Sequence, residues 1–297
     1  MLTIENNQKT IRIACSGRPL LRYQADTAAS KPHFDFVALP PTAELRSGEN
    51  IVLCAPHDQP WHLGLFFSPR SIDGLDFWES ERLAGLGQRF GECRAAGPVK
   101  TQVRDDGAVA FSHDLRWRTS DDETWLTEHR DIVVQPPRDN AYRIDWTITL
   151  TAVGKDRVWN SSGTNADGGG LTFRGLRSME GDAGQVLSSE GDSSIEAVRA
   201  KPARWCDYTG LLDGKVGAGS PDQAGVTLMD HPENPGHPRT WYASTSPGLL
   251  AANPAAGADW ALPLEQSVNL RFAVLVHAGA PDRDRIESEY GHFATPA

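Results

Sequence analysis

AYRIDWTITL, residues 141–150, decides the fold because apolar and polar side chains alternate along it. Its bulky apolar residues fall on one face of an extended chain: Tyr142, Ile144, Trp146, Ile148 and Leu150. A strand of this kind buries one face against a core and leaves the other in water, as strands of antiparallel sheets do. The same period of two recurs in AVAFSHDLRW, residues 108–117, and in SVNLRFAVLV, residues 267–276. These segments predict an antiparallel β protein.

Turn signals separate the strands, and helical periodicity is almost absent. Glycines in DDGA, residues 105–108, and in NADGGG, residues 165–170, can supply the positive φ of tight turns. PDRDRIESEYGHF, about residues 281–293, predicts a short C-terminal helix, because a proline opens it and acidic residues follow. Residues 180–194, rich in glycine, serine and aspartate, are expected to form a loop. We predict one all-β domain over residues 1–297, a single large antiparallel β-sandwich with few short helices.

The composition argues against several classes of protein. A formal net charge of −10 over 297 residues disfavours nucleic acid as a partner, since a phosphate backbone calls for a basic face. No apolar run could span a bilayer and the N-terminus lacks the pattern of a secretory signal, so we expect no membrane association and a cytoplasmic location. The cysteines form no CxxC pair, which disfavours a zinc ribbon and predicts reduced thiols: Cys15, Cys54, Cys93 and Cys206.

The first stretch that could carry chemistry is APHDQPWHLGLFF, residues 55–67, followed by DGLDFWES, residues 73–80. It gathers imidazoles, a carboxylate and tryptophans: His57, Asp58, Trp61, His62 and Trp78. Imidazoles near a carboxylate can serve as an acid–base pair or as part of a metal site, and tryptophan faces suit the apolar faces of sugar rings. The alternative is that Trp78 belongs to the core and that His57 only binds a loop carbonyl.

The second stretch is MDHPENPGHPRTWY, residues 229–242, in which a strand ending at Asp230 leads into a loop rich in proline. Proline biases the residue before it to extended conformations, so the loop has few shapes and can hold side chains in place. The donors and acceptors on this loop are His231, Asn234 and His237. The alternative is a rigid turn whose histidines only face solvent.

The third stretch is NADGGGLTFRG, residues 165–175. Its glycines after Asp167 could let a ligand approach the backbone, and Arg174 could bind a carboxylate or a pair of hydroxyls, although a hairpin turn is the favoured interpretation. Two single residues lie outside these stretches. His113 is expected to be a satisfied core histidine, because it lies in line with apolar neighbours, and Glu128 faces either a cleft or water.

Several blocks, taken in order, resemble the bacterial domain family labelled methane oxygenase PmoA-like: HDQPWHLGLFF, DGLDFW, DGGGL, WCDYTG, DHPENPGHPRTW and LLAANP. The resemblance covers about residues 22–279 and implies a supersandwich related to galactose mutarotase, in bacteria that handle sugars. Where the family's first block usually has two histidines and a basic residue, this chain has Gln59, Trp61 and Leu63. That departure weakens a multi-histidine metal site, so we expect no essential metal and no organic cofactor.

Together these observations predict a carbohydrate-active enzyme of the epimerase, lyase or hydrolase type, acting on a sugar or an oxidised sugar by histidine acid–base chemistry. His62 and His237 would be the acid–base pair at one shared end of the sandwich, with His231 beside them and Asp230 or Glu79 sharing the proton. Substrate contacts are expected from these residues: Trp61, Trp78, Asn234, Asp58, His57, Arg174 and Asp167. The alternatives are a non-catalytic carbohydrate-binding protein and a metal-dependent oxygenase, as the family label suggests. The partner is a small carbohydrate, and the oligomeric state stays open.

Overall fold

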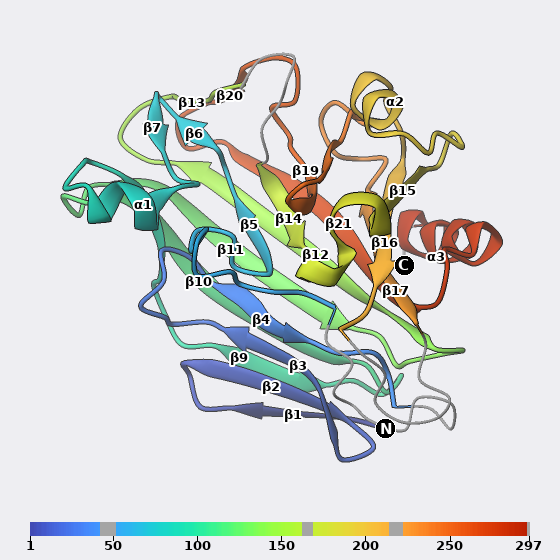
Figure 1. Ribbon diagram of the computed structural model, residues 1–297. Helices are drawn as coiled ribbons and strands as arrows, with labels where there is room; N and C mark the ends of the chain where they lie inside the picture. The colour runs from blue at the N-terminus through green and yellow to red at the C-terminus, as the bar shows by residue number, and fades with distance from the viewer. Residues whose placement is uncertain (42–51, 162–168, 214–221, 296–297) are drawn as a thin grey trace.

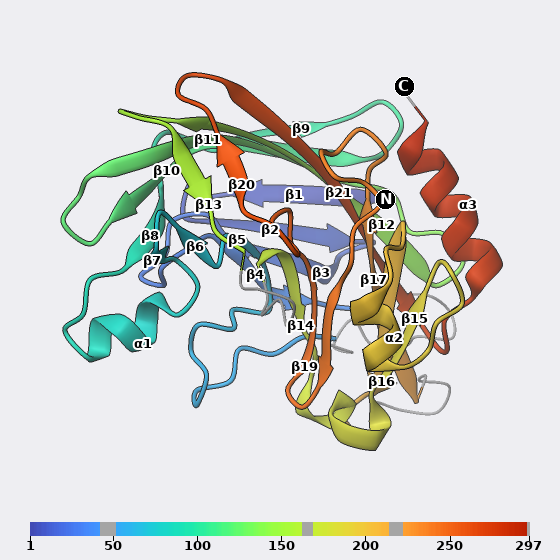
Figure 2. The same ribbon diagram turned by 90° about the horizontal axis from the view of Figure 1, so that it is seen from above.

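The computed structural model describes residues 1–41, 52–161, 169–213 and 222–295. Two antiparallel sheets pack face to face with a small third sheet beside them, and the helices lie outside the sheets (Figures 1 and 2). The all-β sandwich predicted from the alternating segments is therefore confirmed. No helix in these ranges is long and apolar enough to cross a membrane.

One sheet, called here the β12 sheet, contains in spatial order β15 (Gln185–Ser188), β16 (Trp205–Leu211), β17 (Gln223–Asp230), β21 (Ser267–Ala278), β12 (Ala141–Ala152), β11 (Thr124–Val134), β10 (Val109–Thr119) and β8 (Gly91–Ala95), with β9 (Lys100–Val103) also paired to β10. The facing sheet, called the β14 sheet, contains β1 (Leu2–Asn6), β2 (Thr10–Cys15), β3 (Arg18–Gln24), β4 (His33–Val37), β5 (Leu65–Ser68), β14 (Gly170–Arg174), β19 (Gly248–Ala252) and β18 (Tyr242–Thr245). The third sheet contains β20 (Trp260–Leu262), β13 (Arg157–Trp159), β6 (Ser71–Ile72) and β7 (Leu75–Asp76). The helical segments are α1 (Ser80–Gly85), α2 (Ile195–Ala200), α3 (Arg283–Ala294) and the 3₁₀ turns η1 (Arg177–Met179) and η2 (Gly181–Ala183).

The main core lies between the two sheets, where their apolar faces meet. Phe67 of β5 packs against Trp117 of β10 and Phe272 of β21, with ring centroids 6.3 Å and 6.4 Å away. The neighbouring residue Phe66 points to the opposite, outer face of the β14 sheet, because successive side chains of a strand alternate. A smaller apolar cluster forms there with Trp78 and other residues, so this sheet carries buried groups on both faces.

Two predictions about local structure had different outcomes. The C-terminal helix is present as α3, capped by the Asp282 side chain, and it buries Ile286, Tyr290 and Phe293 against the outer face of the β12 sheet (Figure 2). The loop expected over residues 180–194 was wrong in part, since it contains η2 and strand β15. A strand forms there because β16 offers its edge for pairing, a tertiary effect that the local composition does not carry.

A buried polar network crosses the core. Arg130 donates to Glu128 at 2.6 Å and to the Tyr23 hydroxyl at 2.9 Å, and Trp117 donates to the other oxygen of Glu128 at 2.7 Å. The Tyr23 hydroxyl also lies 3.0 Å from His113 Nε2. His113 is thus the core histidine that was predicted. Glu128 faces neither a cleft nor water, because it neutralises a buried arginine.

The free energy of unfolding is expected to fall as the pH drops from about 7 to about 5. Burial, reinforced by the positive charge of Arg130, lowers the pKa of His113 to about 3. Burial, reinforced by Arg174, lowers the pKa of His62 to about 4. The unfolded chain takes up these protons near pH ~6.5, so the stability is complete above that value and is lost on acidification.

The loss should approach about 1.4 kcal/mol per pH unit for each of the two histidines. Urea denaturation at pH values spanning this range measures it, and His62→Gln should remove part of the dependence, since burial also lowers the pKa of His33 and of His231. Exposed His129 acts weakly in the opposite sense, since a hydrogen bond to Asp114 raises its pKa. An unfolding free energy that stays constant over this range would contradict the expectation.

Candidate active site

The candidate site is built around Asp230, the last residue of β17. It stands opposite Phe272 of β21 in the sheet register, so its side chain leaves the inner face of the β12 sheet. The carboxylate is fully buried, with Oδ2 2.9 Å from His237 Nδ1 and Oδ1 3.0 Å from Arg239 Nε. Asn234 donates its side-chain N–H to Oδ1 at 2.7 Å. These partners offset the cost of burying the charge.

Asn234 fixes the loop that follows β17 to the neighbouring strand. Its side-chain oxygen accepts from the Arg271 N–H at 2.7 Å and its nitrogen donates to the Arg271 carbonyl at 2.6 Å, as the backbone of a paired strand would. Gly236 takes a φ of +79°, which favours glycine in the turn before His237. Both polar ends of Asn234 are used inside the protein, so it positions the loop rather than presenting its amide to a substrate.

His237 is the member of this group that reaches solvent, with 12% of its side chain exposed. A carboxylate can only accept a hydrogen bond, so Nδ1 carries the proton and donates it to Asp230. The lone pair of a neutral imidazole then lies on Nε2. No hydrogen bond to Nε2 is found within the described ranges of the chain. Asp230 and His237 therefore form a dyad with one imidazole nitrogen left for a ligand.

Arg239 is the third residue around the Asp230 carboxylate, and it was not predicted from the sequence. The guanidinium is buried, forms an ion pair with the Asp230 carboxylate, and donates to the Asn253 carbonyl at 3.1 Å and to the Pro235 carbonyl at 2.9 Å. Asn253 follows β19, so Arg239 ties the end of one sheet to the carboxylate of the other. The Asn253 side-chain nitrogen is buried and has no partner in the described part of the chain. The available signal was the position of Arg239, just after His237 in the same block.

His231 belongs to the same loop but serves the packing of helix α3. Its Nδ1 accepts from the Glu233 backbone N–H at 3.1 Å, and its ring meets Phe293 edge to face at 5.0 Å. Burial, followed by the charge of Arg271, lowers its pKa. His231 is thus close to the dyad in sequence, but its ring packs against helix α3.

His62 lies in a second cluster, on the outer face of the β14 sheet. Its ring meets Trp61 at 5.7 Å and Trp78 at 5.9 Å, and Trp78 packs on Phe66 at 5.1 Å. Its Nδ1 lies 3.2 Å from the side-chain oxygen of Gln59. Trp78 is buried here, so the alternative that assigned it to an apolar core is the correct one, although the core is the small outer one.

Buried Lys31 stands beneath this cluster and was also missed. Its ammonium donates to the Trp78 carbonyl at 2.9 Å, to the Phe77 carbonyl at 3.3 Å and to the Ser30 hydroxyl at 3.0 Å. Burial lowers its pKa, and its charge is one of those that lower the pKa of His62. A single lysine outside any motif gives no sequence signal. In the fold, the hydrogen bonds of Lys31 hold the turn before α1.

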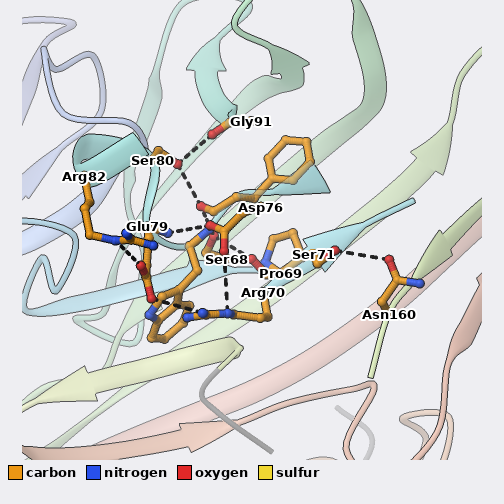
Figure 3. A network of polar contacts seen from close by, with 12 residues as sticks. Ser68, Pro69, Arg70, Ser71, Asp76, Glu79, Ser80, Arg82, Gly91 and Asn160 are labelled. Carbon is orange, nitrogen blue, oxygen red and sulfur yellow. Dashed lines mark hydrogen bonds and ion pairs between the residues drawn. The ribbon is translucent and has the colours of Figure 1, made fainter. Parts of the chain in front are cut away.

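Glu79 forms ion pairs with two arginines (Figure 3). It pairs with Arg70 at 3.0 Å and with Arg82, while Asp76 accepts from the backbone N–H groups of Trp78 and Glu79 at 2.8 Å and 2.6 Å. Burial opposes the shift, but Arg70 and Arg82 hold the pKa of Glu79 below its usual value. This network fixes the turn into α1, so Glu79 does not share a proton with His62.

The remaining predicted contacts are scattered. Arg174 is buried and donates to the Gly175 and Gly248 carbonyls, each at 3.1 Å, while pairing with Glu180 at 2.6 Å. Asp58 is exposed and pairs with Arg177 at 2.6 Å. His57 is exposed, and Asp167 lies outside the described residues.

The structure does not bring His62 and His237 together. β5 and β19 flank β14 and run in the same direction, since each pairs antiparallel with it. His62 lies before the start of β5, on the outer face of the β14 sheet. The Asn253 carbonyl, which accepts a hydrogen bond from Arg239, lies just after the end of β19, between the sheets. The single mouth that was expected is therefore two separate clusters, because adjacent residues of a strand point to opposite faces of its sheet.

The described residues contain no group of three or more histidine, cysteine or acidic side chains that could hold a metal ion. A family model described as a family of unknown function, DUF6807, matches residues 10–291. The chain belongs to this family. The comparison with curated proteins found no match. The DUF6807 description gives no activity, so the methane oxygenase PmoA-like label finds no support in it.

Solved structures that match this DUF6807 chain include one titled "Crystal Structure Analysis of HI1317". The two chains are 10% identical, the match covers 93% of this chain and 99% of the other, and the TM-score is 0.32. A similarity at that level carries no argument about fold or function. The relation to galactose mutarotase implied by the sequence blocks stays a prediction.

Proposed function

We propose that this protein is an enzyme that transfers a proton on a small polyhydroxylated substrate, a sugar or an oxidised sugar, with His237 as the general acid–base. The observation that carries the proposal is the dyad: a fully buried Asp230 orients His237 through Nδ1, and Nε2 is left for a ligand. A base oriented by a buried carboxylate is the arrangement that activates imidazoles in many unrelated enzymes.

Each member of the group has a role in that chemistry. As His237 Nε2 takes a proton from a substrate hydroxyl or carbon, the ring becomes cationic, and the Asp230 carboxylate stabilises the cation. Arg239 pairs with the carboxylate and fixes its position, and Asn234 holds the loop. The buried Asn253 amide, whose side-chain nitrogen has no partner among the described residues, offers a donor for a substrate hydroxyl.

Isomerases, lyases and hydrolases of sugars all require such a proton transfer, so one assay covers them. Proton NMR in D₂O on mixtures of aldoses, ketoses, aldonolactones and uronates, with and without the protein, follows every substrate at once. We expect at least one compound to lose a C–H resonance by deuterium exchange or to give new anomeric or vinylic resonances. Spectra that stay unchanged for all four classes, with protein shown to be folded, would overturn the proposal.

A further inference from the structure

We propose that Trp61, His62 and Tyr242 form a second binding site, for a neutral pyranose ring, on the outer face of the β14 sheet. The inference goes beyond the proposed function, because it assigns a binding site that is separate from the His237 dyad. It starts from the tryptophans, all nine of which lie in the described ranges. All are buried except Trp61 and Trp260.

The two half-buried tryptophans have different surroundings. Trp260 packs on Trp159 at 5.8 Å within the third sheet. Trp61 packs on the outer cluster, as does half-buried Tyr242, which stands opposite Ala251 in the register of β18 and β19. The Arg199 guanidinium lies 4.6 Å from the Tyr242 ring centroid and covers one face of that ring. Two partly open aromatic rings thus border the same buried patch, and such rings suit the apolar faces of a sugar ring, with their edges left for polar contacts.

His62 supplies a hydrogen-bond acceptor within the patch. The imidazole is 7% exposed, and its Nδ1 donates to the Gln59 side-chain oxygen at 3.2 Å, so in the neutral ring Nε2 bears the lone pair. No partner for Nε2 occurs in the described part of the chain. Because burial, and after it the charges of Arg174 and Lys31, lower the pKa of this ring to about 4, Nε2 stays an acceptor at neutral pH. A ligand hydroxyl can therefore donate a hydrogen bond to this acceptor.

Donors lie on the same face. Arg174 belongs to the outer face, opposite Leu249, and its buried Nε has no partner among the described residues. Thr172, fully buried on that face, makes only a long 3.4 Å hydrogen bond to the Gly170 carbonyl. Arg174 is neutralised by Glu180, and the Lys31 ammonium already donates to two carbonyls and a hydroxyl, so neither cation is free to pair with an anionic ligand. Aromatic faces with an uncharged set of donors and acceptors match a pyranose.

A ring bound there lies across the β14 sheet from Asp230 and His237. The site therefore binds the sugar without catalysing a reaction on it. Methyl pyranosides are suitable probes because their anomeric carbon is blocked, which prevents ring opening and mutarotation during the measurement. Saturation-transfer NMR and isothermal titration with methyl α- and β-glucosides, galactosides and mannosides measure binding to the full chain. We expect saturable binding of at least one of these probes.

Trp61→Ala should weaken that binding roughly tenfold or more, and His62→Phe, which keeps a ring but removes the acceptor, should weaken it too. Trp260→Ala, the matched change at the other half-buried tryptophan, should leave affinity within about twofold. Thermal unfolding of each variant establishes that it folds. Absence of binding by the native chain, or native affinity in Trp61→Ala, would overturn the second site.

His237→Ala separates this inference from the proposed function. It should lower turnover of a substrate found by the D₂O assay by roughly a hundredfold or more and leave binding of the methyl pyranosides unchanged. If His237→Ala abolishes that binding while Trp61→Ala does not, the sugar binds only at the dyad, which overturns the second site and supports the proposed function. If binding depends on Trp61 and no compound is turned over, the second site stands and the proposed function fails.

Discussion

Replacing His237 by alanine is expected to lower turnover by roughly two to four orders of magnitude, the usual contribution of a positioned acid–base group. The change removes the only part of the dyad that reaches solvent and leaves Asp230 paired with Arg239 and Asn234. Folding should therefore survive, since the carboxylate keeps two of its partners. Initial rates with the substrate found in D₂O, together with a urea denaturation curve, measure both effects.

The matched control is His231→Asn in the same loop. Its side-chain oxygen can replace His231 Nδ1 as the acceptor for the Glu233 N–H, and the ring it removes contacts helix α3. Turnover should stay within a few-fold of the native value. Native turnover in His237→Ala, or an equal loss in both variants, would remove His237 from the chemistry.

Glu128→Gln is expected to lower the free energy of unfolding by about 3–5 kcal/mol, the usual cost of breaking a buried ion pair. Glu128 and Arg130 both have side chains 0% exposed, and their contact is 2.6 Å long. The amide keeps the size of the carboxylate but leaves the guanidinium charge buried without its counter-ion. Chemical denaturation of the variant measures the loss.

An exposed ion pair provides the comparison. Arg118 pairs with Asp122, whose side chain is 74% exposed, so Asp122→Asn should cost less than about 1 kcal/mol. Arg130→Met together with Glu128→Gln should recover part of the loss, because no unpaired charge remains. Equal small losses in Glu128→Gln and Asp122→Asn would show that the core network does not depend on its charges.

The fold was predictable wherever one strand carries its own burial pattern. β10 and β12 alternate along nearly their whole length and β21 along its first half, so the face that each buries there can be taken from the sequence. From Phe272 on, β21 is buried on both faces, because helix α3 covers the outer one. β15 is short and flanked by glycine and serine, and it becomes a strand only because β16 pairs with it. A partner strand brought from elsewhere in the chain leaves no local signal.

The candidate site was predictable where its residues are close in sequence. Asp230 and His237 lie on one loop whose prolines and hydrogen bonds limit its shape, so their meeting follows from local structure. The prediction that His62 lies beside them was wrong, because the order of the sequence blocks does not show which face of a sheet a loop covers. Arg239 and Lys31 are single basic residues, and only the fold shows what they neutralise or hold.

Chemical rescue tests the central claim most directly. In His237→Gly the imidazole is removed and space is left beside the Asp230 carboxylate, where free imidazole can bind and act in its place. The proposed mechanism predicts that added imidazole restores turnover of the substrate found in D₂O in a saturable manner, and that it does so poorly in His237→Gly combined with Asp230→Asn. Native turnover in His237→Gly without imidazole would contradict the account.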